Sequence, residues 1–115
     1  MKLLGRILLG MGILVFGFVI YNMQSGFRTS DKKTQAYFKK RNAQAKIKTI
    51  PYLNGKLHWI ESGRDTLSKA APLVLFVHGA PGSARDFYSY QVDSILLDRA
   101  LMVSMNRPGY GYSHY

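Results

Sequence analysis

Hydrophobic and polar positions divide the chain into three stretches of different character. Residues 7–27 contain no charged side chain, and their apolar residues lie on all sides of a helix, which predicts a helix that is not amphipathic. Residues 28–47 are rich in Lys, Gln, Thr and Asn, and their apolar residues form no regular stripe. We therefore expect a solvated basic linker there, although Ser30 or Asp31 could cap a short helix. Short apolar runs separated by turn residues follow from residue 48 onward and are typical of a folded domain.

The folded part begins with the pattern of a β-hairpin. Lys48–Leu53 and Lys56–Glu61 are rich in strand-forming residues and are separated by Asn54-Gly55. An Asn-Gly pair between two such runs favours a type I′ turn, because that turn needs positive φ at both central residues. We therefore expect Asn54 and Gly55 to be the two turn residues.

A strand, a helix and a second strand are expected after the hairpin. Leu73–Val77 is a continuous apolar run, which predicts a strand buried on both faces of a parallel sheet. Ser83–Ala100 fits one helix, and Leu101–Met105 fits a further short strand. The order hairpin, strand, helix, strand indicates an α/β fold.

Residues 1–27 have the features of a membrane anchor or signal segment. Lys2 and Arg6 precede an uncharged run of 21 residues, and a helix of that length covers about 30 Å, the thickness of a bilayer core. A cleavable signal peptide would need a small-x-small cleavage site, and Met23-Gln24-Ser25 is a poor one. The sequence therefore favours an uncleaved, single-pass transmembrane anchor.

The net charge of +10 belongs to the N-terminal part rather than to the folded part. Residues 1–48 hold ten Lys or Arg and one acidic residue, whereas residues 49–115 hold six Lys or Arg against five acidic residues. Basic residues beside a membrane segment attract anionic lipid headgroups, with about 1 kcal/mol for each Lys or Arg. We therefore expect membrane lipids as partners of residues 1–27 and of the linker, and no nucleic acid.

Several site chemistries are excluded by composition. The chain has no cysteine, which excludes disulfides, thiolate metal sites and a cysteine nucleophile. His58 and His114 have no carboxylate or histidine partner at ligand spacing, so we expect neither a metal nor another cofactor.

The loop His78-Gly79-Ala80-Pro81-Gly82-Ser83 joins the predicted strand to the predicted helix and carries the most informative chemistry. Such a loop leaves backbone N–H groups free beside a helix start, where they can stabilise a developing oxyanion. A phosphate-binding loop would need Lys and Ser or Thr after its last glycine, and a dinucleotide site would need G-x-G-x-x-G; the sequence matches neither.

A second loop, Arg107-Pro108-Gly109-Tyr110-Gly111-Tyr112-Ser113, follows the next predicted strand. Together the two loops resemble the HGxPG and RPGYGxS loops of the α/β-hydrolase family. The resemblance covers about residues 47–115 and implies that residues 48–115 are an incomplete α/β-hydrolase domain. Asn106 is a departure, since the family commonly has Asp there, and we expect it to weaken a local loop contact without touching the oxyanion hole.

The resemblance also implies roles for the residues of the first loop. The backbone N–H of Ala80 would be the catalytic oxyanion donor, and Gly79 and Gly82 would let the backbone approach the reacting carbonyl. His78 and Pro81 would brace the loop, with His78 acting through hydrogen bonds rather than as the base. A cis Ala80–Pro81 bond is in keeping with similar loops.

No catalytic triad is recognisable in the sequence. Ser83 and Ser113 lie outside a G-x-S-x-G elbow, so capping or turn hydrogen bonds are expected of them. Asp86 and Asp93 are expected on the helix surface. By the resemblance, the strand leading to the nucleophile would lie beside Leu73–Val77 and beyond residue 115, so residues 1–115 alone should expose an open sheet edge and be inactive.

The expected function is therefore that of a longer protein. It would hydrolyse an ester, amide or similar bond of a small-molecule or peptide substrate through a serine acyl-enzyme, with epoxide or haloalkane chemistry by an Asp nucleophile as an open possibility. A small membrane-bound interaction protein without chemistry is the alternative. Six Lys or Arg after the apolar run favour a cytoplasmic body, whereas similar anchored hydrolases are exported; we expect the outer face.

Overall fold

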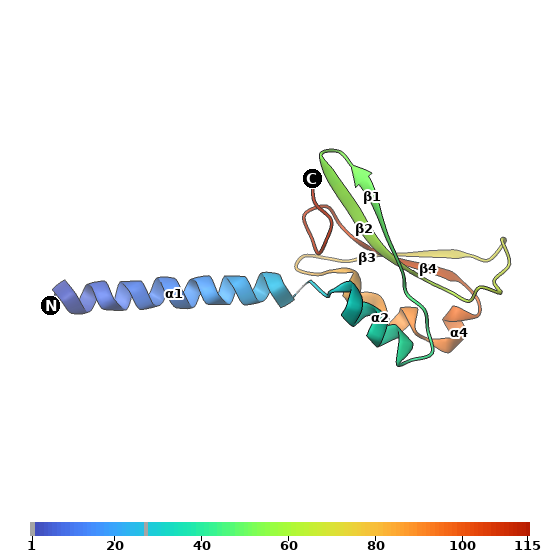
Figure 1. Cartoon of the computed structure of the whole chain (residues 1–115), viewed down its shortest axis with the longest axis horizontal. Helices are drawn as coiled ribbons and strands as arrows, with labels where there is room; N and C mark the ends of the chain where they lie inside the picture. Colours follow the sequence, from blue (N-terminus) through green and yellow to red (C-terminus); the bar gives the residue numbers. More distant parts are fainter. Residues whose placement is uncertain (1, 27) are drawn as a thin grey trace.

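A computed structural model describes the backbone of residues 2–26 and 28–115, with the side chains of residues 5–21 and 28–115. The N-terminal helix α1, Lys2–Gly26, extends away from an α/β body that contains all the strands (Figure 1). The body has one four-stranded mixed sheet with the strand order β1-β2-β4-β3. Its strands are β1 Lys46–Tyr52, β2 Gly55–Ser62, β3 Leu73–Val77 and β4 Leu101–Asn106. The predicted α/β class is confirmed.

The hairpin forms where the sequence predicts it, but its turn is shifted by one residue. Tyr52 pairs with Gly55 across the antiparallel β1–β2 ladder, so the two turn residues are Leu53 and Asn54. Leu53 has φ 52° and Asn54 does not have positive φ, a pattern found in type II′ rather than type I′ turns. Gly55 is needed for another reason: a Cβ at this position would lie within 2.1 Å of the carbonyl oxygen of His114.

β3 and β4 form a parallel pair, and three short helices connect them instead of the single helix predicted over Ser83–Ala100. These are the 3₁₀ helix η1 Ala84–Phe87, α3 Tyr88–Gln91 and α4 Ser94–Leu97. The prediction of one helix is wrong because Asp93 has extended backbone angles and its carboxylate accepts hydrogen bonds from the N–H groups of Ile95 and Leu96. Asp93 therefore starts a new helix by capping it.

The helices cover one face of the sheet and leave the other face open in the part of the chain that is described. Leu73, Leu75 and Val77 are 64%, 55% and 50% exposed, so the prediction that this strand is buried on both faces is wrong. β3 is hydrogen-bonded only to β4 among the described strands, which makes it the expected open edge. On the covered face, the Phe76 ring stacks on the ring of Phe87.

Gln91 fastens this helical layer to the sheet. Its side chain is fully buried, and its Nε2 donates to the carbonyl oxygens of Ile60 on β2 and Met102 on β4, at 2.9 and 3.3 Å. The hydroxyl of Ser104 donates to its Oε1 at 2.6 Å. A buried amide keeps its place only if its polar atoms are satisfied, and here both ends are.

Residues 31–39, expected in a solvated linker, form a helix that is packed on the body. This helix, α2 Asp31–Lys39, begins at Ser30, whose side chain accepts from the N–H of Lys33. Phe38 has no exposed surface and packs with Tyr88 and Ile60 in the larger core cluster. Thr34, one turn earlier on the same face, is also buried. Apart from the half-buried Tyr37, the other described residues of α2 are exposed, so the sequence pattern favours a linker.

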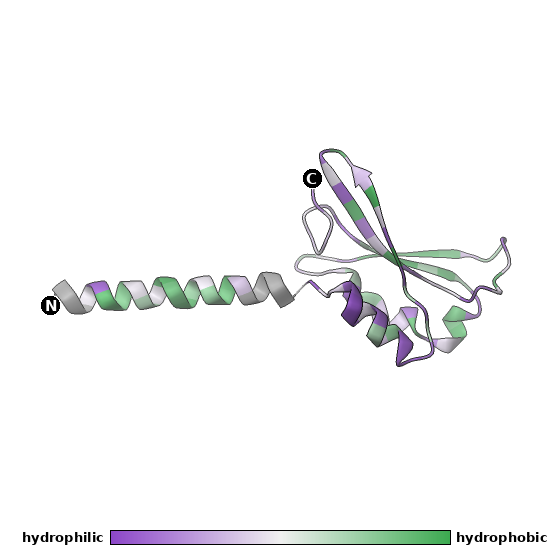
Figure 2. Ribbon diagram, in the orientation of Figure 1, coloured by the Kyte–Doolittle hydropathy of each residue, from purple (hydrophilic) through white to green (hydrophobic). Residues whose placement is uncertain are grey.

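Between residues 5 and 21, α1 carries many apolar side chains, as the green bands in Figure 2 show. Within the residues that the structure describes, we find no helix with the length and hydropathy needed to cross a bilayer. The transmembrane run expected over residues 7–27 includes residue 27 and the side chains of residues 22–26, which lie outside the described part.

Replacing Phe38 with Ala tests the packing of α2. We expect Phe38→Ala to lower the free energy of unfolding by about 3–5 kcal/mol, because it empties a fully buried position. Lys39→Ala, on the exposed side of the same helix, should change it by less than about 0.5 kcal/mol. Urea denaturation of the full chain in detergent micelles measures both, and equal effects of the two substitutions would show that α2 is not part of the core.

Candidate functional site

The two glycine-containing loops meet at the carboxyl ends of β3 and β4. Val77 pairs with Met105 in the parallel ladder, so His78, which follows β3, comes beside Asn106, the last residue of β4. Open α/β sheets commonly bind ligands at this edge. The register therefore brings together residues 78–83 and 106–113, which lie apart in the sequence.

His78 connects the two loops through both of its ring nitrogens. Nε2 is the acceptor for the backbone N–H of Arg107 at 3.2 Å, and Nδ1 lies 2.7 Å from the carbonyl oxygen of Gly79. Because a backbone N–H can only donate, Nε2 carries no hydrogen and Nδ1 donates to Gly79. The buried ring also meets the ring of Tyr110 edge-on. His78 thus has the contacts of a bracing residue, and no nitrogen is left to act as a base.

The loop itself has one open glycine and one confined glycine. No described atom lies within 4 Å of a Cβ built on Gly79, whereas a Cβ on Gly82 would lie 2.6 Å from Asp86 Oδ2 and 3.1 Å from His78 Nδ1. Ala80 is exposed between them, and the Ala80–Pro81 peptide bond is cis, in keeping with the resemblance.

The two serines at this edge are engaged in structural hydrogen bonds. Ser83 forms a capping box with Asp86: its Oγ accepts from the N–H of Arg85, while the Asp86 carboxylate accepts from the N–H of Ser83. Ser113 Oγ accepts from the N–H of His58 at 2.8 Å. The capping and turn hydrogen bonds expected of both residues are present.

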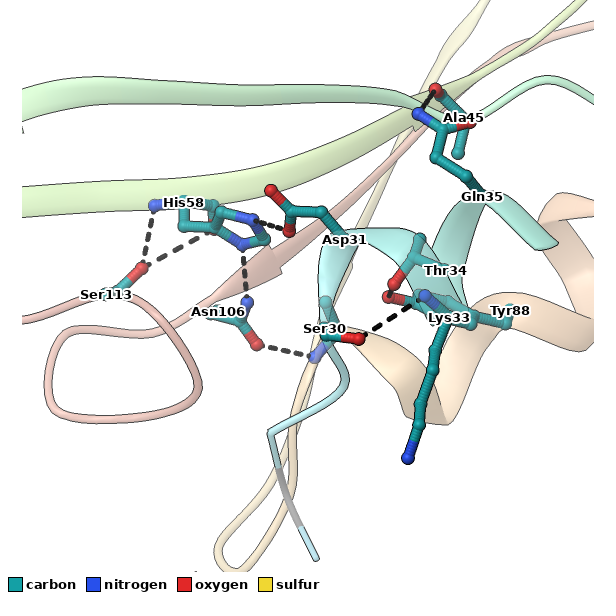
Figure 3. Close-up of polar contacts among 11 residues, drawn as sticks. Ser30, Asp31, Lys33, Thr34, Gln35, Ala45, His58, Tyr88, Asn106 and Ser113 are labelled. Carbon is teal, nitrogen blue, oxygen red and sulfur yellow. Dashed lines mark hydrogen bonds and ion pairs between the residues drawn. The ribbon is translucent and has the colours of Figure 1, made fainter. Parts of the chain in front are cut away.

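Asn106 lies at the centre of a buried polar network that the sequence analysis missed. Its Oδ1 accepts from the N–H of Ala84 at 2.9 Å, and its Nδ2 lies 2.8 Å from Nδ1 of His58 (Figure 3). Its amide joins the start of η1 to β2, and the expectation that Asn106 weakens a local contact relative to Asp stays a prediction. Gly111, with φ 55°, passes so close that a Cβ there would lie 2.5 Å from the Asn106 side chain.

The same network reaches α2. His58 Nε2 is 3.6 Å from Asp31 Oδ1, and the hydroxyl groups of Thr34 and Tyr88 lie 3.0 Å apart. Figure 3 shows how these four side chains lie. His58 and Asn106 are direct partners across the β2–β4 ladder. They are 48 residues apart in the sequence, so only the strand register could have revealed this pair.

Burial controls the ionisation of two members of the network. The pKa of His58 is lowered mainly by desolvation, while the charge and hydrogen bonding of Asp31 act in the opposite direction and Lys56 adds to the lowering. Desolvation also raises the pKa of Tyr88. Both groups are therefore favoured in their neutral forms.

Little enclosed space lies within the network. A cavity of about 10 Å³ touches His58, Asn106 and Tyr88, and it is no larger than a water molecule requires. A larger hollow of about 270 Å³ lies at the opposite end of the parallel strands, around Gly63 and Leu101. Among the described residues, no three His, Cys, Asp or Glu side chains are grouped as a metal site would need.

Comparisons with known proteins support the fold. No protein-family model matches the chain, and no curated protein sequence matches it. Among solved structures, it is similar to a membrane phospholipase A described as a bacterial virulence factor, with 21% identity and a TM-score of 0.52 over 93% of this chain and 32% of that chain. It is also similar to the Cif epoxide hydrolase from Acinetobacter nosocomialis, with 23% identity and a TM-score of 0.49 over 75% of this chain and 28% of that one.

The likeness to the phospholipase shows a shared fold. It extends over nearly the whole of this chain, which spans about a third of the length of the solved structures that it matches.

The difference between the two glycines provides a test of the loop. Gly82→Ala should destabilise the protein by about 1–3 kcal/mol, because its methyl group would displace the Asp86 carboxylate or the His78 ring. Gly79→Ala is the matched control and should have a smaller effect, since its methyl group enters open space. Thermal unfolding of the two variants measures the difference, and a larger loss for Gly79→Ala would contradict this geometry.

Proposed function

We propose that these residues are the N-terminal part of an α/β-fold hydrolase and that the backbone N–H of Ala80 stabilises the oxyanion during cleavage of an ester, amide or similar bond. The observation that carries the proposal is the His78 bridge: one buried side chain fixes the loop after β3 to the loop after β4 at the ligand-binding edge of a parallel strand pair. Preorganised backbone donors are effective because they need no rearrangement during the reaction.

The surroundings of Ala80 support a role as donor. Ala80 is exposed, and the space beside Gly79 leaves room for a substrate to approach the backbone. On the other side, Gly82 and Ser83 are buried. The Asp86 carboxylate accepts from the N–H of Ser83, and the Asn106 side chain accepts from the N–H of the next residue, Ala84. A rigid base with an open front suits a group that must meet a reacting carbonyl.

The nucleophile, its acid and its base belong, in this proposal, to polypeptide that joins the same sheet. Ser83, Ser113 and His78 are all committed to structural hydrogen bonds, so none of them is suited to the chemistry. We propose serine acyl-enzyme chemistry on a small-molecule or peptide substrate. The similarity to a membrane phospholipase A fits ester cleavage, and an Asp nucleophile would instead give epoxide or haloalkane chemistry.

We also propose that α1 attaches the body to a membrane as a single-pass anchor, with the body on the outer face. Ile7, Leu14 and Phe16 are among many apolar side chains of α1 that are exposed, and the sequence run without charges continues to residue 27. α2 presents exposed Lys32, Lys33 and Lys39 next in the chain, where anionic headgroups would meet them.

Removing the donor N–H tests the proposed reaction. In an active polypeptide that begins with these residues, replacing Ala80 by lactic acid turns the Gly79–Ala80 amide into an ester and deletes one N–H. We expect kcat for an ester substrate to fall by about 10²–10³-fold. The same exchange at Ala71, whose N–H bonds to Ser68 at the far end of β3, should leave kcat nearly unchanged.

An unchanged kcat after the amide-to-ester replacement at position 80 would show that the Ala80 N–H does not take part in the reaction. The hydrolase proposal fails if there is no active protein longer than these 115 residues and if the 115 residues prove compact and inert. A membrane-bound interaction protein then becomes the better interpretation.

A reporter fusion tests the attachment and its direction. Alkaline phosphatase, which is active only after export, would be fused after Tyr115. We expect phosphatase activity that stays with alkali-washed membranes. Leu14→Lys should release it, because a Lys at the centre of a spanning helix costs about 2.5–3.5 kcal/mol, whereas Lys33→Ala should not. Activity confined to cytoplasmic reporters would reverse the proposed orientation.

A further inference from the structure

The orientation of the Asn106 amide is fixed by chemistry. The N–H of Ala84 can only donate, so the amide oxygen must face it, at 2.9 Å. The NH₂ group then faces His58 Nδ1 at 2.8 Å and must donate to it. His58 is therefore neutral with its hydrogen on Nε2, which is the nitrogen that lies 3.6 Å from Asp31.

A proton added to His58 would break this arrangement. Nδ1 would become a donor and would face the donor NH₂ of Asn106. Rotating the amide by half a turn would satisfy His58, but it would place the NH₂ against the N–H of Ala84. One hydrogen bond is lost in either case, since one amide oxygen cannot serve two donors on opposite sides.

We propose that Asn106 is a positioning residue for the loop of residues 78–83, which leads into η1 at Ala84, and that protonation of His58 releases this loop. When His58 is neutral, the amide oxygen of Asn106 accepts from the N–H of Ala84, which directly follows Ser83, the N-cap residue of η1. When His58 is charged, its ring is attracted more strongly to Asp31, and the Asn106 amide loses its hydrogen bond to either His58 or Ala84. Lowering the pH thus weakens the contact between Asn106 and the loop while it strengthens the ion pair between His58 and Asp31 on α2.

Charged and titratable groups on several elements surround His58. Asp31 on α2 favours the charged ring, and Lys56 on the same strand opposes it. The ring of Tyr112 lies 5.4 Å away between centroids. Arg85 on η1 and Tyr88 on α3 line the small cavity next to the imidazole.

The consequence for catalysis rests on the proposed function, because it makes Ala84 part of the support for Ala80. The coupling between His58 and Ala84 does not depend on the proposed function, since it follows from which of these groups can donate and which can accept a hydrogen bond. α2 follows α1 in the chain, so the network gives the N-terminal helices a polar connection to the candidate oxyanion loop.

Nuclear magnetic resonance on the full chain in detergent micelles tests the coupling. Long-range ¹H–¹⁵N correlations report the tautomer and titration of His58, and hydrogen exchange reports the protection of the Ala84 N–H. We expect the Nε2–H tautomer in the neutral form. As His58 becomes charged, the protection of Ala84 should fall about tenfold, the effect of losing one typical hydrogen bond, relative to the N–H of Asp86, which bonds to Ser83 in the same segment.

Two substitutions should shift the pKa of His58 in opposite directions. Asn106→Asp offers a carboxylate that accepts from both sides, so His58 should have a higher pKa and Ala84 should stay protected at every pH. Asp31→Asn removes the attraction on the other side of the ring and should lower the pKa of His58. His114→Gln, at an exposed histidine, is the control and should change neither signal.

Protection of Ala84 that does not depend on the charge of His58, or a hydrogen on Nδ1 in the neutral ring, would overturn the proposal. If Asn106→Asp does not fold, the titration of the unmodified chain and of Asp31→Asn, at an exposed residue, still decides. Coupling without any hydrolase activity in the longer polypeptide would refute the proposed function and leave the coupling intact.

Discussion

The parallel register of β3 and β4 is the constraint on which the rest of the site depends. It sets Val77 beside Met105, and every later contact between the two loops follows from that pairing. His78 reaches the N–H of Arg107 because the two strands end together, and Asn106 reaches the start of η1 for the same reason. A slip of one strand by one residue would turn its side chains to the opposite face of the sheet and separate the two loops' contacts. The candidate site is thus a property of the sheet more than of either loop.

Much of the fold could be predicted because apolar runs report strands directly. Leu73–Val77 was located without error, and the order of elements gave the α/β class. The break in the helix was missed because a single aspartate, Asp93, outweighs the apolar pattern by capping. The turn at Leu53 was misplaced because the demand for glycine at position 55 comes from a distant segment near His114, which local sequence does not report.

The candidate site was predictable only in its local part. The loop around Ala80 is marked by adjacent glycines and proline, so its composition was enough to single it out. The partnership of His58 and Asn106 depends on which residues face each other across β2 and β4, and neither residue is unusual in its own neighbourhood. The docking of α2 through Phe38 was hidden for a related reason, since one buried aromatic residue in a basic helix makes a weak periodic signal.

The buried amide of Gln91 has a consequence for how this sequence can change. Its two ends serve carbonyl oxygens on two strands and the hydroxyl of Ser104. An apolar residue at position 91 alone leaves the buried hydroxyl of Ser104 without its acceptor, and an apolar residue at position 104 alone removes a donor from Gln91. Each buried group left unsatisfied costs about 1–3 kcal/mol. The two positions are therefore epistatic: an apolar pair or the present polar pair can occupy them, but the path between these pairs passes through a less stable intermediate.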